Sequence, residues 1–200
     1  SIPAPMPLAV IPYTQASEDF SDSIFNIIVS KQLNENTNFY AKVSEGWKAG
    51  SFNGETSSQA VFVNAFKPQS TTSIEAGLKS RFADGKGAFN LAVFQDTHED
   101  KQEFIFLATN AAESVVKNFG EQEITGLEAE LYYQASPNLY FQASIGTLDA
   151  EYNEARDDAG NDVSDAFAHP FVPDLTTMLT LDYNFGSGPR GTAGIRIDAY

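Results

Sequence analysis

Apolar and polar side chains alternate at every second position along most of the chain after residue 22. A period of two is typical of β-strands that have one apolar and one polar face. The pattern predicts eight strands, at residues 23–33, 37–47, 72–82, 88–98, 121–134, 139–151 and 175–185 and from Thr192 onward. Residues 1–22 are rich in proline and then acidic, so we expect a loop or irregular segment there, followed by β-hairpins over 23–200.

The predicted strands are joined alternately by short turns and long polar loops. The turns lie near residues 34–36, 84–87, 135–137 and 186–190, and the loops near residues 53–70, 99–120 and 153–172. Tight turns at one end and long loops at the other are typical of transmembrane β-barrels, in which the turns face the periplasm and the loops face outward. The pattern therefore predicts an all-β fold, an antiparallel transmembrane β-barrel. Within the second loop we expect a short helix at 108–117.

The turns also predict how the strands pair. A turn beginning at Asp84 places Phe82 opposite Phe89 and sets Phe94 across from Gly77, where its ring covers the bare glycine. The other expected pairs are Leu78 with Val93, Arg81 with Asn90, Glu75 with Asp96, Tyr133 with Leu139, Leu131 with Phe141 and Leu127 with Ile145. In this register all the apolar side chains of a hairpin share one face.

Charged side chains gather on the polar face of the predicted strands. They are Glu75, Lys79, Arg81, Glu128, Glu130, Asp182 and Arg196. Because unpaired charges are costly in a dry core, this face is expected to meet water, either bulk solvent or a wet barrel interior. The apolar face forms a continuous band that needs lipid or a second protein layer.

The composition narrows the possible functions. The net charge of −15 and the lack of clustered Lys and Arg argue against a nucleic-acid partner. The chain has no cysteine, and therefore no disulfide or thiolate site. No apolar run approaches the ~18 residues of a membrane helix, but barrel strands need only ~9–11 residues of alternating polarity. The N-terminal residues do not resemble a signal peptide, and we expect the chain to be a fragment or a processed product.

Five segments resemble the barrel strands of TonB-dependent outer-membrane receptors. In chain order they are YAKVSEGWKAGSFN at 40–53, TSIEAGLKS at 72–80, FNLAVF at 89–94, NFGEQEITGLEAEL at 118–131 and LDAEY at 148–152. The resemblance covers roughly residues 23–200, and it is similar in style to the siderophore-receptor branch of that family.

The resemblance implies a Gram-negative outer-membrane protein that imports a scarce solute, most often a ferric siderophore. Such receptors have a barrel of about 22 strands with a plug inside, and they are coupled to TonB through the plug. This chain would supply about eight strands of the barrel, in contact with outer-membrane lipid, and it contains no plug, coupling box or Phe-terminated last strand. The implied mechanism is binding without bond chemistry, with no cofactor. The three long loops would help to capture the solute, but no individual contact residue is assigned.

Two segments match motifs from other protein classes. Residues 186–191 fit the dinucleotide fingerprint G-x-G-x-x-G, but strand-like alternation resumes at once where that motif requires a helix, and we interpret them as a hairpin turn. Residues 156–165 hold several carboxylates that could chelate Ca²⁺. Their spacing is not that of an EF-hand, and we favour a solvated loop.

A few single residues are functional candidates as well. Glu128 and Glu130 could do acid–base chemistry but fit a hydrated barrel wall better. The two histidines, His98 and His169, lie in different predicted loops and have no local ligand partner for zinc. No nucleophile motif such as G-x-S-x-G is present, and we expect no enzyme activity. For Trp47 and Tyr40 we favour an aromatic belt or loop packing over ligand contact.

Two alternatives to the partial barrel remain open. A complete eight-stranded outer-membrane barrel would have an interior filled by side chains, so its inward charges would have to pair tightly. A soluble β-sandwich, for instance a glycan-binding module, would bury the apolar face against another sheet. Dependence on detergent separates the sandwich from both barrels.

Overall fold

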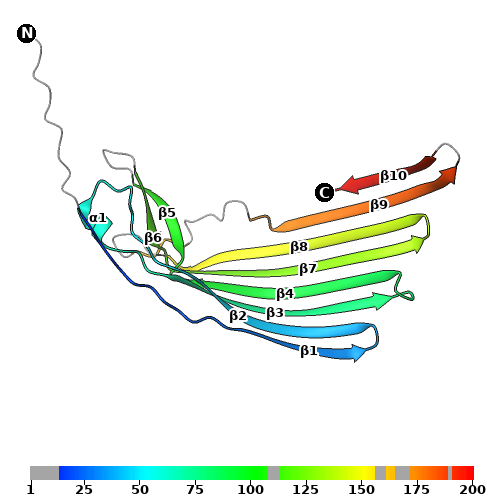
Figure 1. The fold of residues 1–200 in the computed structure, drawn as a ribbon, viewed down its shortest axis with the longest axis horizontal. Coiled ribbons are helices and arrows are strands. Elements are labelled where there is room, and N and C mark those ends of the chain that lie inside the picture. The colour runs from blue at the N-terminus through cyan, green and yellow to red at the C-terminus, as the bar shows by residue number, and fades with distance from the viewer. Residues whose placement is uncertain (1–13, 108–112, 156–160, 165–171, 189–190) are drawn as a thin grey trace, which may run out of the picture.

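The computed structural model describes residues 14–107, 113–155, 161–164, 172–188 and 191–200, most of which lie in β-strands (Figure 1). One antiparallel sheet contains, in chain order, β1 (Asn26–Asn34), β2 (Thr37–Lys48), β3 (Gln69–Phe82), β4 (Gly87–Glu99), β7 (Glu121–Ser136), β8 (Leu139–Glu154), β9 (Leu175–Gly188) and β10 (Gly191–Ala199). A separate hairpin is formed by β5 (Gln102–Leu107) and β6 (Glu113–Asn118), and α1 spans Gln59–Val63. The predicted antiparallel β-fold is confirmed.

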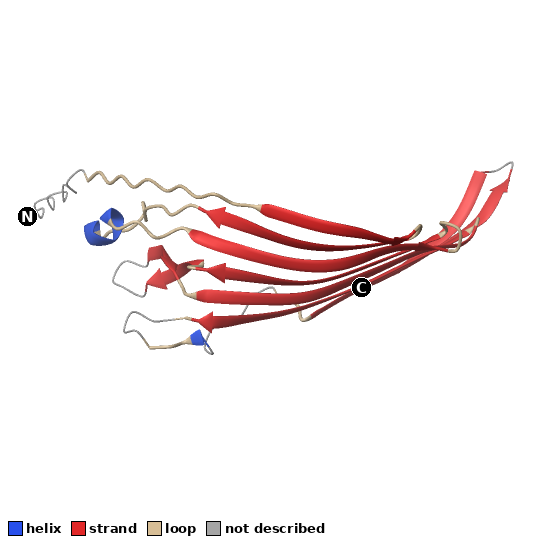
Figure 2. Ribbon diagram, turned by 90° about the horizontal axis from the view of Figure 1, so that it is seen from below, coloured by secondary structure: helices blue, strands red, loops and turns tan. Residues whose placement is uncertain are grey.

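The large sheet is curved but open (Figures 1 and 2). Its strand order runs from β1 to β10, so these two strands form opposite edges and do not pair with each other. A complete eight-stranded barrel would require that pairing, because closure joins the first strand to the last. The sheet therefore has the form of a section of a larger barrel wall.

Short and long connections lie at opposite ends of the sheet (Figure 1). The turn end carries residues 35–36, 83–86 and 137–138, and the loop end carries the described residues that follow β2, β4 and β8: 49–68, 100–107, 113–120, 155, 161–164 and 172–174. The helix α1 and the β5–β6 hairpin both lie at the loop end. Within the described ranges, no helix is long and apolar enough to cross a bilayer.

One face of the sheet carries an apolar belt, which is interrupted on β1 by Lys31. Strand pairing aligns one row of it as Val29, Ala41, Ala76, Val93, Leu127, Thr147 and Leu175. Belt side chains on five strands, Val29, Ile74, Val93, Ile145 and Leu179, are 43–66% exposed. In the described part of the chain no second layer covers this face, so the sandwich alternative does not hold. The buried apolar residues there, Val115, Phe119 and Ala155, lie at the loop end.

The predicted β3–β4 pairing is wrong by two residues. Phe82 lies opposite Gly87, because the turn begins at Ala83, which adopts a positive φ of 52°. The turn is closed by a hydrogen bond from the N–H of Gly85 to the carbonyl of Phe82, at 3.1 Å. Alanine rarely adopts this backbone conformation, so the sequence alone favoured a later start. In this strand pair Leu78 meets Leu91, Arg81 meets Ala88, Glu75 meets Phe94 and Gly77 meets Ala92.

The predicted β7–β8 pairing is also wrong by two residues. A bulge between Gln134 and Ser136 moves the register, so that Tyr133 pairs with Phe141. By the same shift Leu131 meets Ala143 and Leu127 meets Thr147. A register shift of two residues keeps every side chain on the same face of the sheet. The apolar belt was therefore predicted correctly although the strand-pairing partners were not.

The expected helix at 108–117 is wrong over its described part. Residues 113–118 form β6, which pairs with β5, and residues 108–112 lie outside the described ranges. Phe94 covers a glycine as expected, but the glycine is Gly126 rather than Gly77.

Candidate ligand-binding surface

A charged network lies midway along the polar face. Lys42 Nζ donates to Glu75 Oε2 at 2.7 Å, and the Tyr40 hydroxyl donates to Glu75 Oε1 at 2.5 Å. The ammonium group of Lys79 lies 5.6 Å from the centroid of the Tyr40 ring. The ring of Tyr40 also covers Gly77 on the polar face. The prediction that Tyr40 belongs to an aromatic belt is therefore wrong. These contacts hold the charges of a wet wall in place.

Glu128 and Glu130 share the polar face of β7, as predicted. Asn90 Nδ2 donates to Glu130 Oε2 at 3.1 Å from the neighbouring strand. This amide contact supports a hydrated wall as the role of these carboxylates. Trp47 pairs with Ser70 at the loop end of the outward face, where a girdle residue is expected.

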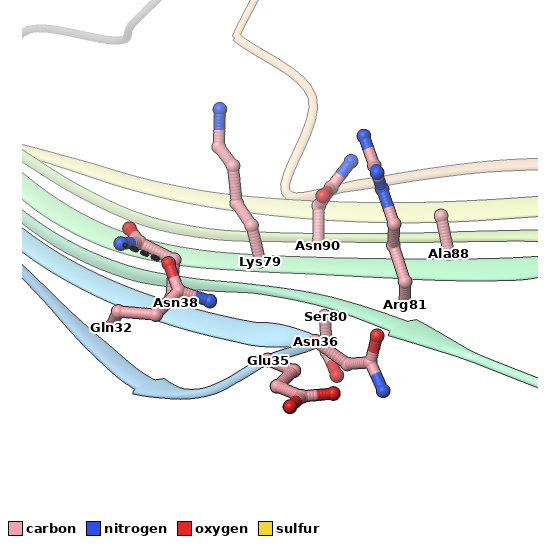
Figure 3. Close-up of a pocket in the computed structure, with 9 residues that line it drawn as sticks. All are labelled: Gln32, Glu35, Asn36, Asn38, Lys79, Ser80, Arg81, Ala88 and Asn90. Atoms are coloured by element: carbon pink, nitrogen blue, oxygen red, sulfur yellow. Dashed lines mark hydrogen bonds between the residues drawn. The ribbon is translucent and has the colours of Figure 1, made fainter. Parts of the chain in front are cut away.

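A hollow of about 480 Å³ lies at the turn end of the polar face (Figure 3). Residues of β1 to β4 and of the turn between β1 and β2 line it: Gln32, Glu35, Asn36, Asn38, Lys79, Ser80, Arg81, Ala88 and Asn90. The lining is polar and includes two cations, which makes the hollow a candidate site for an anionic group.

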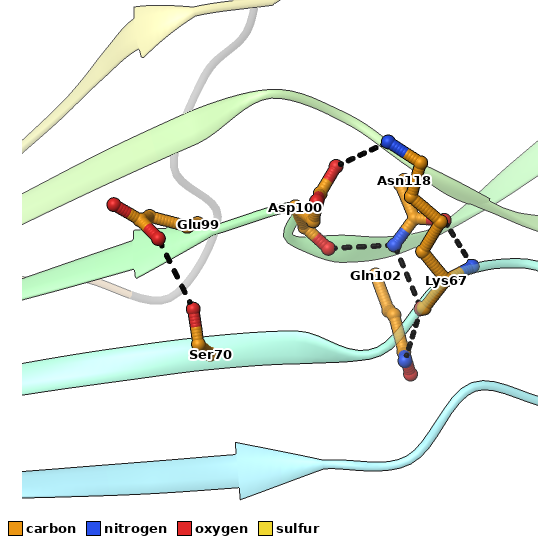
Figure 4. A network of polar contacts seen from close by, with 6 residues as sticks. All are labelled: Lys67, Ser70, Glu99, Asp100, Gln102 and Asn118. Carbon is orange, nitrogen blue, oxygen red and sulfur yellow. Dashed lines mark hydrogen bonds and ion pairs between the residues drawn. The ribbon is translucent and has the colours of Figure 1, made fainter. Parts of the chain in front are cut away.

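At the loop end, Gln102 connects three strands (Figure 4). Its side-chain amide is buried and donates to the carbonyls of Ala49 and Lys67, at 2.9 and 3.0 Å. Its backbone N–H donates to Gln69 Oε1 at 2.9 Å. One glutamine thus attaches the start of the β5–β6 hairpin to the ends of β2 and β3.

Two asparagines join the first long loop to β6. Asn53 accepts from the N–H of Val116 at 2.7 Å and donates to its carbonyl at 3.0 Å. Asn118 makes the same pair of bonds with the backbone of Lys67, at 2.7 and 2.9 Å (Figure 4). Each side-chain amide makes the pair of hydrogen bonds that a neighbouring strand's backbone would otherwise make. These bonds join the loop and the hairpin into one unit.

A polar clamp formed by Lys101, Glu103 and Tyr152 holds the hairpin against β8. Lys101 Nζ lies 2.5 Å from Glu103 Oε1 and donates to the Tyr152 hydroxyl at 3.1 Å, which donates to Glu103 at 3.0 Å. Partial burial favours neutral Glu103, but the bonds from Lys101 and Tyr152 outweigh it and hold the pKa of Glu103 below its ordinary value. Burial likewise opposes the charge of Lys101, and its two bonds raise its pKa.

A second hollow, of about 490 Å³, lies between the first loop and the hairpin. Its lining combines lysine and asparagine side chains with an apolar floor, and it includes Asn53, Ala60, Asn64, Phe66, Lys67, Asp100, Val116, Lys117 and Asn118. Lys67 is paired with Asp100 at 3.5 Å. The structure therefore brings together two of the three loops predicted to capture a solute. Much of the third loop lies outside the described residues.

The other candidates gain no ligand site. His98 Nδ1 lies 2.8 Å from Thr71 Oγ1, and His169 is outside the described residues. Of the acidic stretch 156–165, only 161–164 are described, and there the Ser164 hydroxyl donates to Asp162 at 2.8 Å. Gly188 pairs with Gly191 across a hairpin, so the glycine motif does not open a helix.

Sequence reasoning missed the residues that organise the loop end. Asn53 and Val116 are far apart in the chain, as are Gln102 and Ala49, and such side-chain-to-backbone contacts leave no local pattern. The hairpin itself gave a weak signal, because residues 104–107 are uniformly apolar and do not alternate.

Comparison with known proteins agrees with this fold. A family model described as TonB dependent receptor-like, β-barrel, matches residues 15–199. The ferric yersiniabactin uptake receptor FyuA from Yersinia pestis is 20% identical with a TM-score of 0.67, over 86% of this chain and 24% of its own. The ferric preacinetobactin receptor BauA from Acinetobacter baumannii is also 20% identical, with a TM-score of 0.62, over 86% of this chain and 24% of its own.

A solved structure described as the copper transporter OprC is similar as well. It is 18% identical with a TM-score of 0.62, over 86% of this chain and 30% of its own. The chain thus spans about a quarter to a third of the length of these structures. At such identities the likeness concerns the fold.

Proposed function

Because the chain belongs to the TonB-dependent receptor-like β-barrel family, we propose that it forms part of the wall of an outer-membrane receptor that imports a ferric siderophore. Members of this family are transport receptors and not enzymes. Energy for import would come from TonB, through a plug domain elsewhere in the receptor.

The observation that carries this proposal is the apolar belt. On β7 it runs from Thr125 to Tyr133, eight steps of ~3.4 Å, or about 27 Å along the strand. A strand tilt of ~40° shortens this to about 20 Å, close to the ~25 Å apolar band of outer-membrane barrels. At this end of the belt Thr125 pairs with Asp149, and beyond it Glu123 pairs with Glu151, so the carboxylates of the outward face gather where the wet headgroup region is expected.

The siderophore assignment rests on two of the similar receptors and on the loop-end hollow. FyuA is a receptor for ferric yersiniabactin, and BauA is a receptor for ferric preacinetobactin. The apolar lining of the hollow suits the organic part of such a chelate, and the largely exposed ammonium group of Lys67 suits its anionic oxygens. Because OprC is a copper transporter, copper is the competing cargo.

Uptake in cells tests the proposal. A strain that lacks the gene for the full-length receptor is grown under iron limitation and supplied with ⁵⁵Fe on a panel of siderophores, or with ⁶⁴Cu. We expect loss of uptake of at least one ferric siderophore, restored by the gene and abolished without TonB. Loss of copper uptake alone would show that the protein is a transport receptor whose ligand is copper and not a ferric siderophore. Unchanged uptake of every solute would overturn the proposal.

A further inference from the structure

Two cations project from the polar face into the turn-end hollow. Lys79 and Arg81 are two positions apart on β3, and therefore about 7 Å apart along the strand. Figure 3 shows their side chains rising from the sheet beside Asn90 of β4. They lie at the end of the polar face that is remote from the loops.

Within the described ranges no carboxylate forms an ion pair with Lys79 or Arg81, although Glu75, which pairs with Lys42, also attracts Lys79. Two other cations of the polar face, Lys42 and Arg196, pair with carboxylates, at 2.7 and 3.0 Å. Lys79 instead contacts the ring of Tyr40, and Arg81 takes part in no ion pair there. Glu35 also lines the hollow, but it points away from Lys79 and Arg81 in Figure 3. An unpaired positive pair stands out in a chain with a net charge of −15.

Three of the four side-chain amides that line the hollow, those of Gln32, Asn38 and Asn90, are already engaged. Gln32 donates to the carbonyl of Asn34 at 2.5 Å and accepts from Asn38 at 3.4 Å. Asn90 donates to Glu130 at 3.1 Å. The strongest remaining hydrogen-bonding groups are therefore an ammonium and a guanidinium, which donate and cannot accept. A site of this kind matches an oxyanion, and the planar fork of arginine suits a carboxylate.

We propose that Lys79 and Arg81 form a binding site for a carboxylate group inside the barrel. The inference rests on the proposed function only in that the polar face must line the barrel interior. A carboxylate could reach the site on an acidic side chain from another part of the receptor or on a transported solute. The site requires the same chemistry in both cases, and an experiment with two arms separates the sources.

Both arms use the full-length receptor and a K79Q/R81Q variant. The control variant, K31Q/K86Q, removes the same charge outside the hollow, since Lys31 lies on the outward face and Lys86 in a turn. In the first arm, p-benzoylphenylalanine replaces Ala88, which lines the hollow. After irradiation in cells, mass spectrometry identifies the crosslinked peptide. In the second arm, calorimetry measures binding of citrate, a tricarboxylate, to the purified receptor.

A receptor side chain as the source predicts a crosslink to an acidic segment, reduced at least fivefold in K79Q/R81Q and unchanged in the control. A solute as the source predicts citrate binding, weakened at least tenfold by the same variant only. The proposal is overturned if neither signal exists, or if neither depends on Lys79 and Arg81 more than on the control residues. Normal uptake with no effect in either arm would refute this site and leave the proposed function standing.

Discussion

The apolar belt and the loop end of this sheet are stabilised in opposite ways. The belt exposes side chains such as Val29 and Ile74 and makes no contact with a second protein layer in the described residues, so its stability depends on lipid. The loop end buries Val115 and Phe119 and is held by side-chain amides and a salt bridge. Damage to the belt should therefore affect membrane insertion of the whole barrel. Damage to the loop end should stay local.

The largest effect is expected from a charge in the belt. Val93→Arg should destabilise the receptor by about 2–4 kcal/mol, the cost of arginine near the bilayer midplane. Ala92→Arg is the matched control, because Ala92 lies on the polar face directly opposite Glu128. Urea unfolding in lipid vesicles measures both. Equal losses would contradict the assignment of the two faces.

A methyl group at Gly120 should give the next largest effect. Gly120 has a positive φ of 71°, and an added Cβ would collide with the carbonyl of Glu154. Gly120→Ala should loosen the β5–β6 hairpin by ~2 kcal/mol or more, from the left-handed conformation and the displaced backbone. Hydrogen exchange should speed up in β5 and β6 with an unchanged urea midpoint. Gly54→Ala, where the added group meets nothing within 4 Å, is the control.

Removal of one amide link should have a smaller effect at the same end. Asn53→Leu leaves the N–H and carbonyl of Val116 without their side-chain partner, at a cost of about 1–2 kcal/mol. Amide exchange of Val116 reports the loss, and Asn64→Leu serves as control because Asn64 bonds only the carbonyl of Ala60 among the contacts described. Unfolding of the entire barrel by Asn53→Leu would contradict the local role of this link.

The smallest effect is a dependence of the clamp on pH. The pKa of Glu103 is lowered in the folded state, so its contribution is present above the unfolded value of 4.5 and is lost as the pH falls through the folded value. The raised pKa of Lys101 gives a contribution that is lost only as the pH rises above 10.5 and through its folded value. The free energy of hairpin opening, obtained from exchange rates corrected for the intrinsic pH dependence of amide exchange, should be constant between these limits and fall below pH 4.5. Glu103→Gln should abolish this fall in acid and cost about 1 kcal/mol after solvent screening.

Periodicity predicted the sheet because a strand that separates lipid from water must alternate. The eight strands of the sheet, the two faces and the opposite ends for turns and loops were all readable from the positions of side chains such as Leu78 and Lys79. The exact partners were not, because Ala83 adopts an unusual backbone conformation and a bulge follows Gln134. Neither feature leaves a pattern of residue types.

The loop end was harder to predict for a different reason. Its order depends on contacts between distant segments, such as Asn53 with Val116 and Lys101 with Tyr152, and alternation carries no information about them. The hairpin there was taken for a helix because the local composition of residues 108–117 is compatible with one. The hollow with Lys79 and Arg81 was equally hidden, although both cations were correctly placed on the polar face.

The most direct test of the two-faced wall is spin-label accessibility along β4. Single cysteines replace residues 91–95 in turn, in an otherwise cysteine-free receptor in lipid vesicles, and each carries a nitroxide. We predict a period of two: labels at Leu91 and Val93 relax with oxygen dissolved in lipid, while labels at Ala92 and Phe94 do not. Equal oxygen accessibility at neighbouring positions, or contact with a water-soluble nickel chelate at Leu91 and Val93, would contradict the account.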